Sequence, residues 1–182
     1  AHMDAHTPIS ALTAETKWGG HLHGTPLAHL LGHGDRHLCE IGDYRTKIAP
    51  EHVALIGVRS YEPEEEALLN RLGVRVYKMD EINERSFDIC WQEAVERVSG
   101  APKGWGISFD CDGLDPADAP GVGTPEENGI TVSVLCDVIK KTENFKGLQA
   151  CELVEYNALN DQDFKTAETI LTLLGTMLAN ID

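Results

Sequence analysis

The fold is decided by residues 108–116, which read SFDCDGLDP. Apolar and small residues lead straight into acidic ones, as in a buried strand that ends in carboxylates. Side chains two apart in a strand point the same way, so we expect Asp110 and Asp112 to share one face at the carboxyl end of a strand. Two like charges this close repel each other unless a cation lies between them, and a divalent metal is the usual cation.

Strands and helices alternate around this stretch, which predicts βαβ units and an α/β fold with an open parallel sheet. We expect one domain over residues 1–182, with residues 1–25 as a long loop that is rich in Gly, Pro, Thr and His. The expected strands cover residues 53–58, 74–77, 107–109 and 148–154. The expected helices cover residues 25–31, 63–72 (closed by Gly73), 87–98, 131–141 and 164–178.

The chain is acidic, with 30 Asp and Glu against 15 Lys and Arg among 182 residues and a formal net charge of −15. This balance argues against nucleic acid or an anionic membrane as a partner. It suits a cationic ligand, although an acidic surface that serves only solubility is the alternative. The sequence has no apolar run long enough to span a bilayer and no signal-peptide pattern. Five cysteines, none at CxxC spacing, favour a reducing, cytoplasmic location.

Metal-ligating residue types gather in three places along the chain. They are AHMDAHTP at residues 1–8, Asp110 with Asp112, and ELVE at residues 152–155. Histidine together with carboxylates is a mixed N/O ligand set that suits manganese or another first-row divalent ion. The alternatives without a metal are a solvated His-rich tail at the N-terminus and a pair of aspartates that only stabilise a turn.

Four motifs, taken in order, resemble those of the ureohydrolase family, the arginase and agmatinase group. They are AHMDAHTP at residues 1–8, GHLHG at 20–24, SFDCDGLDPADAPGVGT at 108–124 and EYN at 155–157. The resemblance implies the three-layer αβα architecture of that family, with an open parallel sheet. The Thr7-Pro8 pair is similar to the one that follows the first metal motif in arginases.

The resemblance also implies a centre of two Mn²⁺ ions. Setting Ala1-His2-Met3-Asp4 on the family's Ala-His-x-Asp makes His2, Asp4, Asp110 and Asp112 metal ligands. The family's first aspartate and its Gly-Gly-Asp-His segment would then fall before residue 1. The chain thus resembles the C-terminal part of a ureohydrolase, without the N-terminal strands and first metal ligands, and we expect residues 1–182 alone to be inactive.

Catalytic roles follow from the same resemblance. A hydroxide that bridges the two metals would attack the central carbon of a guanidinium group, and Asp4 would hydrogen-bond this hydroxide. Glu155 would pair with the guanidinium, and His23 would carry a proton to the leaving amine. Asp115 we expect to be structural, bracing the loop that carries Pro116.

The substrate-binding positions resemble those of arginases less closely. Thr124 would place a hydroxyl beside the guanidinium, and Glu62 would meet the α-amino group. His6 and His21 stand where arginases hold the α-carboxylate with asparagine and serine. Charged histidines could still bind a carboxylate.

The function implied is hydrolysis of a small cationic guanidino substrate, with L-arginine giving L-ornithine and urea. Alternatives within the family are agmatinase and another guanidino-acid or formimino hydrolase. An alternative of another class is an inactive homologue that serves as a subunit or regulatory partner. The family resemblance further implies a homotrimer or homohexamer.

Overall fold

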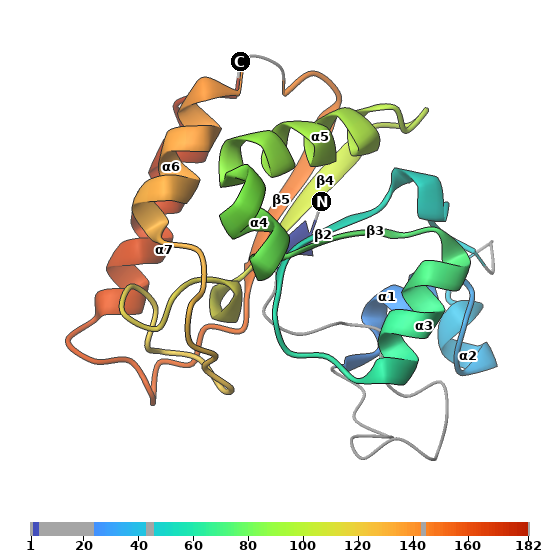
Figure 1. The fold of residues 1–182 in the computed structure, drawn as a ribbon, viewed down its shortest axis with the longest axis horizontal. Helices are drawn as coiled ribbons and strands as arrows, with labels where there is room; N and C mark the ends of the chain where they lie inside the picture. The colour runs from blue at the N-terminus through green and yellow to red at the C-terminus, as the bar shows by residue number, and fades with distance from the viewer. Residues whose placement is uncertain (1, 4–23, 43–45, 143–144, 182) are drawn as a thin grey trace.

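A five-stranded parallel sheet forms the centre of the protein (Figure 1). The computed structural model describes residues 2–3, 24–42, 46–142 and 145–181, with only the backbone of His2. The strands are β1 (His2–Met3), β2 (Ala54–Val58), β3 (Arg75–Lys78), β4 (Trp105–Asp110) and β5 (Leu148–Val154). Their order in the sheet is β3-β2-β1-β4-β5, and every neighbouring pair is parallel. The expected α/β class is confirmed.

Helices fill most of the connections between strands. All five expected helices are present, and α3 ends at Gly73, whose φ of 74° is the left-handed conformation that glycine adopts readily. The α-helices are α1 (Pro26–Leu30), α2 (Arg36–Cys39), α3 (Pro63–Leu72), α4 (Met79–Arg85), α5 (Phe87–Ser99), α6 (Val132–Lys141) and α7 (Lys165–Leu178), with 3₁₀ turns η2 (Pro50–His52) and η3 (Cys111–Gly113). In the described part of the chain, no helix combines the length and apolarity that a membrane crossing needs.

The shortest strand is also the most central one, which corrects the prediction of a continuous loop over residues 1–25. Strand β1 pairs with β2 on one side and β4 on the other, with His2 in register with Leu55 and Ser108. Met3 is 2% exposed. Two residues are too few to show an alternating pattern, and this strand is defined by partners that lie far along the chain.

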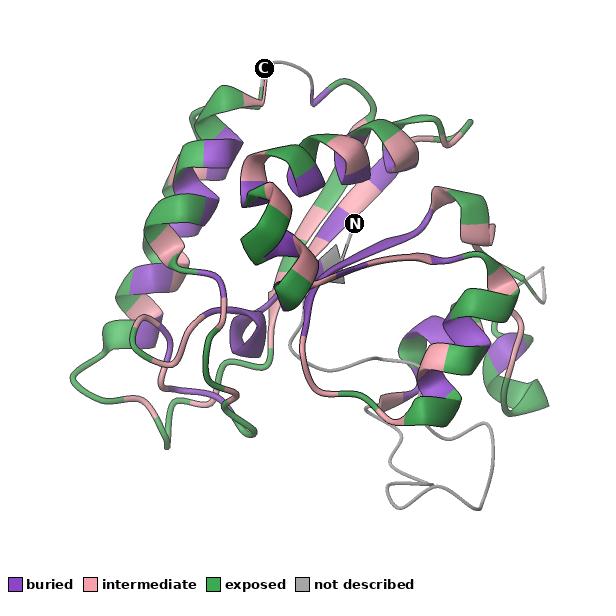
Figure 2. Ribbon diagram, viewed as in Figure 1, coloured by how far each residue is buried: buried purple, intermediate pink, exposed green. Residues whose placement is uncertain are grey.

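Helices cover both faces of the sheet, as the three-layer prediction requires. Alternate residues of β2 divide between two apolar clusters, because successive strand residues point to opposite faces. Ala54 and Ile56 pack in the cluster that contains Trp91 of α5, whereas Leu55 packs in the cluster that contains Leu27 of α1. Figure 2 shows β2 buried along its whole length.

The strand order locates the most favourable place for a ligand. The chain moves from β1 to β2 and β3 on one side, and then crosses to β4 and β5 on the other. The strand order therefore reverses between β1 and β4. In open α/β sheets, ligands bind at such a switch point, outside the carboxyl ends of the strands. Asp110 is the last residue of β4 at this edge.

Candidate metal centre

Asp110 and Asp112 lie together at the switch point. Strand β4 ends at Asp110 and the chain turns at once into η3, so Asp112 sits in a 3₁₀ turn. The backbone N–H of Asp112 donates a hydrogen bond of 3.1 Å to Oδ1 of Asp110. The predicted proximity is thus found, but the predicted cause, a shared strand face, is wrong. Each aspartate is only 6% exposed, and burial of two adjacent carboxylates favours a bound cation.

The thiol of Cys111, between the two aspartates, is affected by burial and by nearby carboxylates. Cys111 is 2% exposed. Burial raises the pKa of the Cys111 thiol to about 12, and neighbouring carboxylates add to the rise. These carboxylates belong to Asp110, Asp112, Glu155 and Asp161. Cys111 therefore packs as a neutral side chain.

A set of hydrogen bonds fixes the loop that follows η3. The carboxylate of Asp115 accepts from the backbone N–H of Ala117 at 2.9 Å and of Gly129 at 3.2 Å. The backbone N–H of Asp115 also donates to the carbonyl of Ile130 at 3.0 Å. The bracing role expected for Asp115 is confirmed, because one carboxylate joins the two ends of the loop.

Glu155 and Thr124 lie on two loops that are joined by hydrogen bonds. Glu155 directly follows β5, one residue past Val154, the register partner of Asp110. Its φ of 61° is unusual for a residue other than glycine, and such strain is often found at functional sites. The two loops are joined by hydrogen bonds from Asn157 N to Gly121 O at 2.8 Å and from Asn160 Nδ2 to Val122 O at 2.7 Å. Both Glu155 and Thr124 are exposed.

Glu62 stands apart from these loops, at the start of α3. It is half-buried, and its backbone N–H donates to Oε2 of Glu65 at 2.9 Å. Glu65 is 6% exposed, and this bond gives its carboxylate a role in capping the helix. Of Glu62 and Glu65, Glu62 is therefore the one that solvent reaches more readily.

Several predicted site residues lie outside the described part of the chain. They are Asp4, His6, His21 and His23, together with the side chain of His2. Among the residues that are described, no three His, Cys, Asp or Glu side chains form a group able to hold a metal. The predicted ligand set is therefore represented by its two aspartates, and the roles of the other residues stay predictions.

Arg59, which directly follows β2, is a residue whose role the sequence did not reveal. Its guanidinium donates to the backbone carbonyl of Asp112 at 2.8 Å. An arginine at the carboxyl end of a fully buried strand is a weak signal by itself. A combination of that position with the neighbouring acidic turn could have drawn attention to it.

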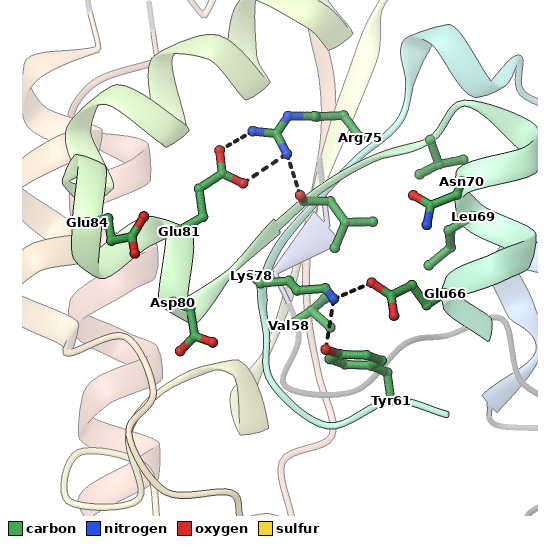
Figure 3. Close-up of a pocket in the computed structure, with 12 residues that line it drawn as sticks. Val58, Tyr61, Glu66, Leu69, Asn70, Arg75, Lys78, Asp80, Glu81 and Glu84 are labelled. Carbon is green, nitrogen blue, oxygen red and sulfur yellow. Dashed lines mark hydrogen bonds and ion pairs between the residues drawn. The ribbon is translucent and has the colours of Figure 1, made fainter. Parts of the chain in front are cut away.

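A cavity of about 400 Å³ lies beside β3, the outermost strand on the side of β2 (Figure 3). Its cations are paired within the protein: Lys78 Nζ bonds Tyr61 Oη at 2.8 Å and also meets Glu66, while Arg75 meets Glu81. Two strands, β2 and β1, separate β3 from β4. This cavity is therefore distinct from the aspartate pair.

Comparisons with known proteins point to one family. The model of the Arginase family matches residues 1–179. An arginase from Bacillus caldovelox is 38% identical over 96% of this chain and 58% of its own length. A crystal structure of arginase from Bacillus caldovelox superposes with a TM-score of 0.90 at 36% identity, covering 98% of this chain and 59% of that one. A crystal structure of arginase from Bacillus cereus superposes with a TM-score of 0.89 at 31% identity, covering 96% of this chain and 60% of that one. The chain thus spans about three fifths of the length of these relatives.

Proposed function

The chain belongs to the arginase family, and we propose that the complete protein is a manganese-dependent ureohydrolase that converts L-arginine to L-ornithine and urea. One observation carries the proposal: Asp110 and Asp112 are buried side by side at the switch point of a parallel sheet. Hard carboxylate oxygens, joined by His2, whose backbone lies in β1, make a donor set that fits Mn²⁺.

In this proposal His2, Asp4, Asp110 and Asp112 hold two Mn²⁺ ions. When bound, the ions supply a water molecule whose pKa is lowered toward neutrality. The chain's own contribution is to fix the ligands. The hydrogen bond from Asp112 N to Oδ1 of Asp110 orients the Asp110 carboxylate toward the turn, which reduces the reorganisation needed when a cation binds.

Glu155 is proposed to bind the guanidinium of the substrate. A carboxylate matches the planar fork of guanidinium donors and can accept two parallel hydrogen bonds. The unusual backbone at Glu155 and its position one residue past the register partner of Asp110 support a role for this residue near the proposed metal centre. Thr124 is proposed to add a hydroxyl from the adjoining loop, and His23 to protonate the leaving amine.

Substrate identity is proposed from charge. Glu155, a carboxylate that directly follows β5, favours a cationic head group on the substrate. His6, His21 and Glu62 are proposed to bind the α-carboxylate and α-amino group of arginine. Agmatine lacks the carboxylate, so preference for arginine depends on the two histidines.

The test is release of urea by the complete protein supplied with Mn²⁺, with arginine and agmatine as parallel substrates. The proposal expects urea from arginine, loss of activity on chelation and recovery when Mn²⁺ is restored. Equal or faster turnover of agmatine would replace arginine by agmatine as the substrate. No hydrolysis of either compound by a protein that is folded and loaded with Mn²⁺ would favour an inactive homologue.

A further inference from the structure

One guanidinium joins three separate segments at the carboxyl edge of the sheet. Arg59 donates to the carbonyls of Asp112 and Leu114 in the turn after β4, and to Glu126 and Glu127 in the loop that follows Thr124. Its bonds to backbone carbonyls include those to Asp112 at 2.8 Å, Leu114 at 3.2 Å, Glu126 at 2.8 Å, Glu127 at 3.0 Å, Gly113 at 3.3 Å and, as the third segment, Gly57 of β2 at 3.1 Å.

The first consequence concerns Asp112, whose two flanking peptide groups are both held. Its N–H donates to Oδ1 of Asp110, and its carbonyl accepts from Nη2 of Arg59. The backbone of Asp112 is therefore fixed from both sides. Because a side chain starts from its backbone, the separation of the two carboxylates depends on Arg59 as well as on the local turn.

The second consequence concerns the loop that carries Thr124. Nη2 of Arg59 serves both Asp112 and Glu126, so the turn and the loop share one anchor. The backbone N–H of Ile130 also donates to the carbonyl of Gly113 at 3.2 Å. Arg59 thus sets the position of the aspartate pair relative to a loop that the proposed function assigns to the substrate.

Arginine is suited to this task in a way that lysine is not. It offers five N–H donors in a rigid plane, whereas lysine offers three donors on a single rotating ammonium. The anchor itself is firm, because Arg59 follows the fully buried strand β2 and also bonds the carbonyl of Gly57 within that strand. Hydrogen bonds from a charged donor are also stronger than neutral ones.

We propose that Arg59 is a positioning residue for the metal centre, one that sets the spacing of Asp110 and Asp112 by holding the carbonyl side of their turn. This inference rests on the proposed function, because it assigns metal ligation to the two aspartates. Changes in the groups that support metal ligands commonly weaken metal binding by about 10- to 100-fold.

The chain provides a matched control in Arg97 of α5. Arg97 also donates to three backbone carbonyls, those of Val53 at 2.9 Å, Pro50 at 3.2 Å and Gly73 at 2.7 Å. These acceptors lie just before β2 and at the end of α3. They are therefore at the amino ends of the strands, whereas Asp110 is at the carboxyl end of β4. The same substitution at Arg97 removes similar bonds without touching the aspartate turn.

The experiment measures Mn²⁺ binding by calorimetry, thermal unfolding and arginine hydrolysis for the complete wild-type protein, Arg59→Lys, Arg59→Met and Arg97→Lys. We expect Arg59→Lys to bind Mn²⁺ about 10- to 100-fold more weakly, with Arg59→Met weaker still, whereas Arg97→Lys keeps the wild-type Mn²⁺ affinity. Both lysine variants should unfold at a lower temperature than wild type.

Each contrary result has a distinct meaning. Unchanged Mn²⁺ affinity in Arg59→Lys, with a wild type that binds Mn²⁺ and releases urea, would overturn the positioning role and leave the proposed function intact. An equal loss of affinity in Arg97→Lys, or failure of Arg59→Lys alone to fold, would assign Arg59 a general structural role instead. A wild type that binds no Mn²⁺ would overturn both proposals.

Discussion

At each end of strand β2 an arginine donates hydrogen bonds to backbone carbonyls, but the segments that it joins differ. At its amino end Arg97 joins Val53, Pro50 and Gly73, which belong to a strand entry, a 3₁₀ turn and a helix end. At its carboxyl end Arg59 joins the aspartate turn to the loop after Thr124. The bonds are alike, so the residues that each arginine holds decide what it does: Arg97 stabilises the scaffold, and Arg59 arranges side chains that can bind a cation.

This contrast follows from the direction of the strands. Parallel strands bring all their carboxyl ends to one edge, and the loops that leave this edge carry Asp112, Thr124 and Glu155. Binding groups are concentrated on loops that a rigid scaffold positions. Substitutions of these groups, or of residues that position them, should therefore alter metal or substrate binding, while substitutions of residues that only brace the scaffold should alter stability alone.

The largest effect is expected for Asp112→Asn in the complete protein. Removing a proposed ligand should lower arginine hydrolysis by more than about 100-fold, beyond the range typical of a supporting residue. Steady-state urea release at saturating Mn²⁺ measures this effect.

Asp118→Asn is the control for this change, because the Asp118 carboxylate accepts from Val132 N at 2.8 Å at the start of α6. It should lose stability and keep Mn²⁺ affinity. A reverse outcome, with metal binding lost at Asp118 and kept at Asp112, would break the distinction between carboxylates that bind metal and carboxylates that brace a loop.

Glu155→Gln should have the next largest effect. The amide retains shape but loses the charge that matches a guanidinium, and a hydrogen bond to a charged group contributes about 1.5–3 kcal/mol. We expect kcat/KM for arginine to fall by about 10- to 100-fold, while Mn²⁺ affinity is unchanged. Kinetics at saturating Mn²⁺ measure this, and a loss of Mn²⁺ binding instead would make Glu155 a metal-site residue.

Asp115→Ala should act on the loop between these groups. Two backbone N–H groups, of Ala117 and Gly129, lose their acceptor, which costs about 1–3 kcal/mol of unfolding free energy. Denaturant unfolding measures the loss. Asp115→Asn retains one acceptor oxygen and should recover part of it; equal losses in the two variants would show that the bonds to Asp115 contribute little.

The smallest effect is expected at the β3 edge. The hydrogen bond with Arg75 is the main cause that lowers the pKa of Glu81 below its ordinary value of 4.5. A lowered folded-state pKa stabilises the protein above the unfolded-state pKa, and this gain is lost as pH falls through the folded-state pKa. Glu81→Gln should therefore reduce stability at pH 7 by less than about 1 kcal/mol, because both side chains are partly exposed.

The stability difference between wild type and Glu81→Gln should disappear in acid, below the folded-state pKa. Unfolding measured across pH 2–7 follows this. A difference that persists at the lowest pH would mean that packing, rather than charge, explains the effect. Glu81→Gln should hydrolyse arginine as fast as wild type at neutral pH, since β2 and β1 separate β3 from the strand that ends at Asp110.

Local patterns in the sequence predicted most of the fold. The continuous apolar run before Val58 and the Pro63 and Gly73 boundaries of α3 are signals carried by neighbouring residues, and the structure agrees with them. Strand β1 carries no such signal, because its two residues are strand only through pairing with β2 and β4. The α/β class followed from local periodicity, and the central strand did not.

The candidate site divides in the same way. Asp110 and Asp112 are two apart in sequence, so their proximity was predictable even though a 3₁₀ turn, rather than a strand face, produces it. The role of Arg59 was not predictable, because its acceptors beyond β2 are backbone carbonyls 53 to 68 positions away. Any residue type can supply a carbonyl, so no sequence pattern marks these partners.

The central claim is that Asp110 and Asp112 form part of a metal centre at the carboxyl edge of the sheet. Its most direct test is the number of Mn²⁺ ions bound per chain, measured by calorimetric titration of the complete protein and of Asp112→Asn. We predict two ions for the wild type and fewer than two for the variant. Two ions bound with equal affinity by both proteins would contradict the account.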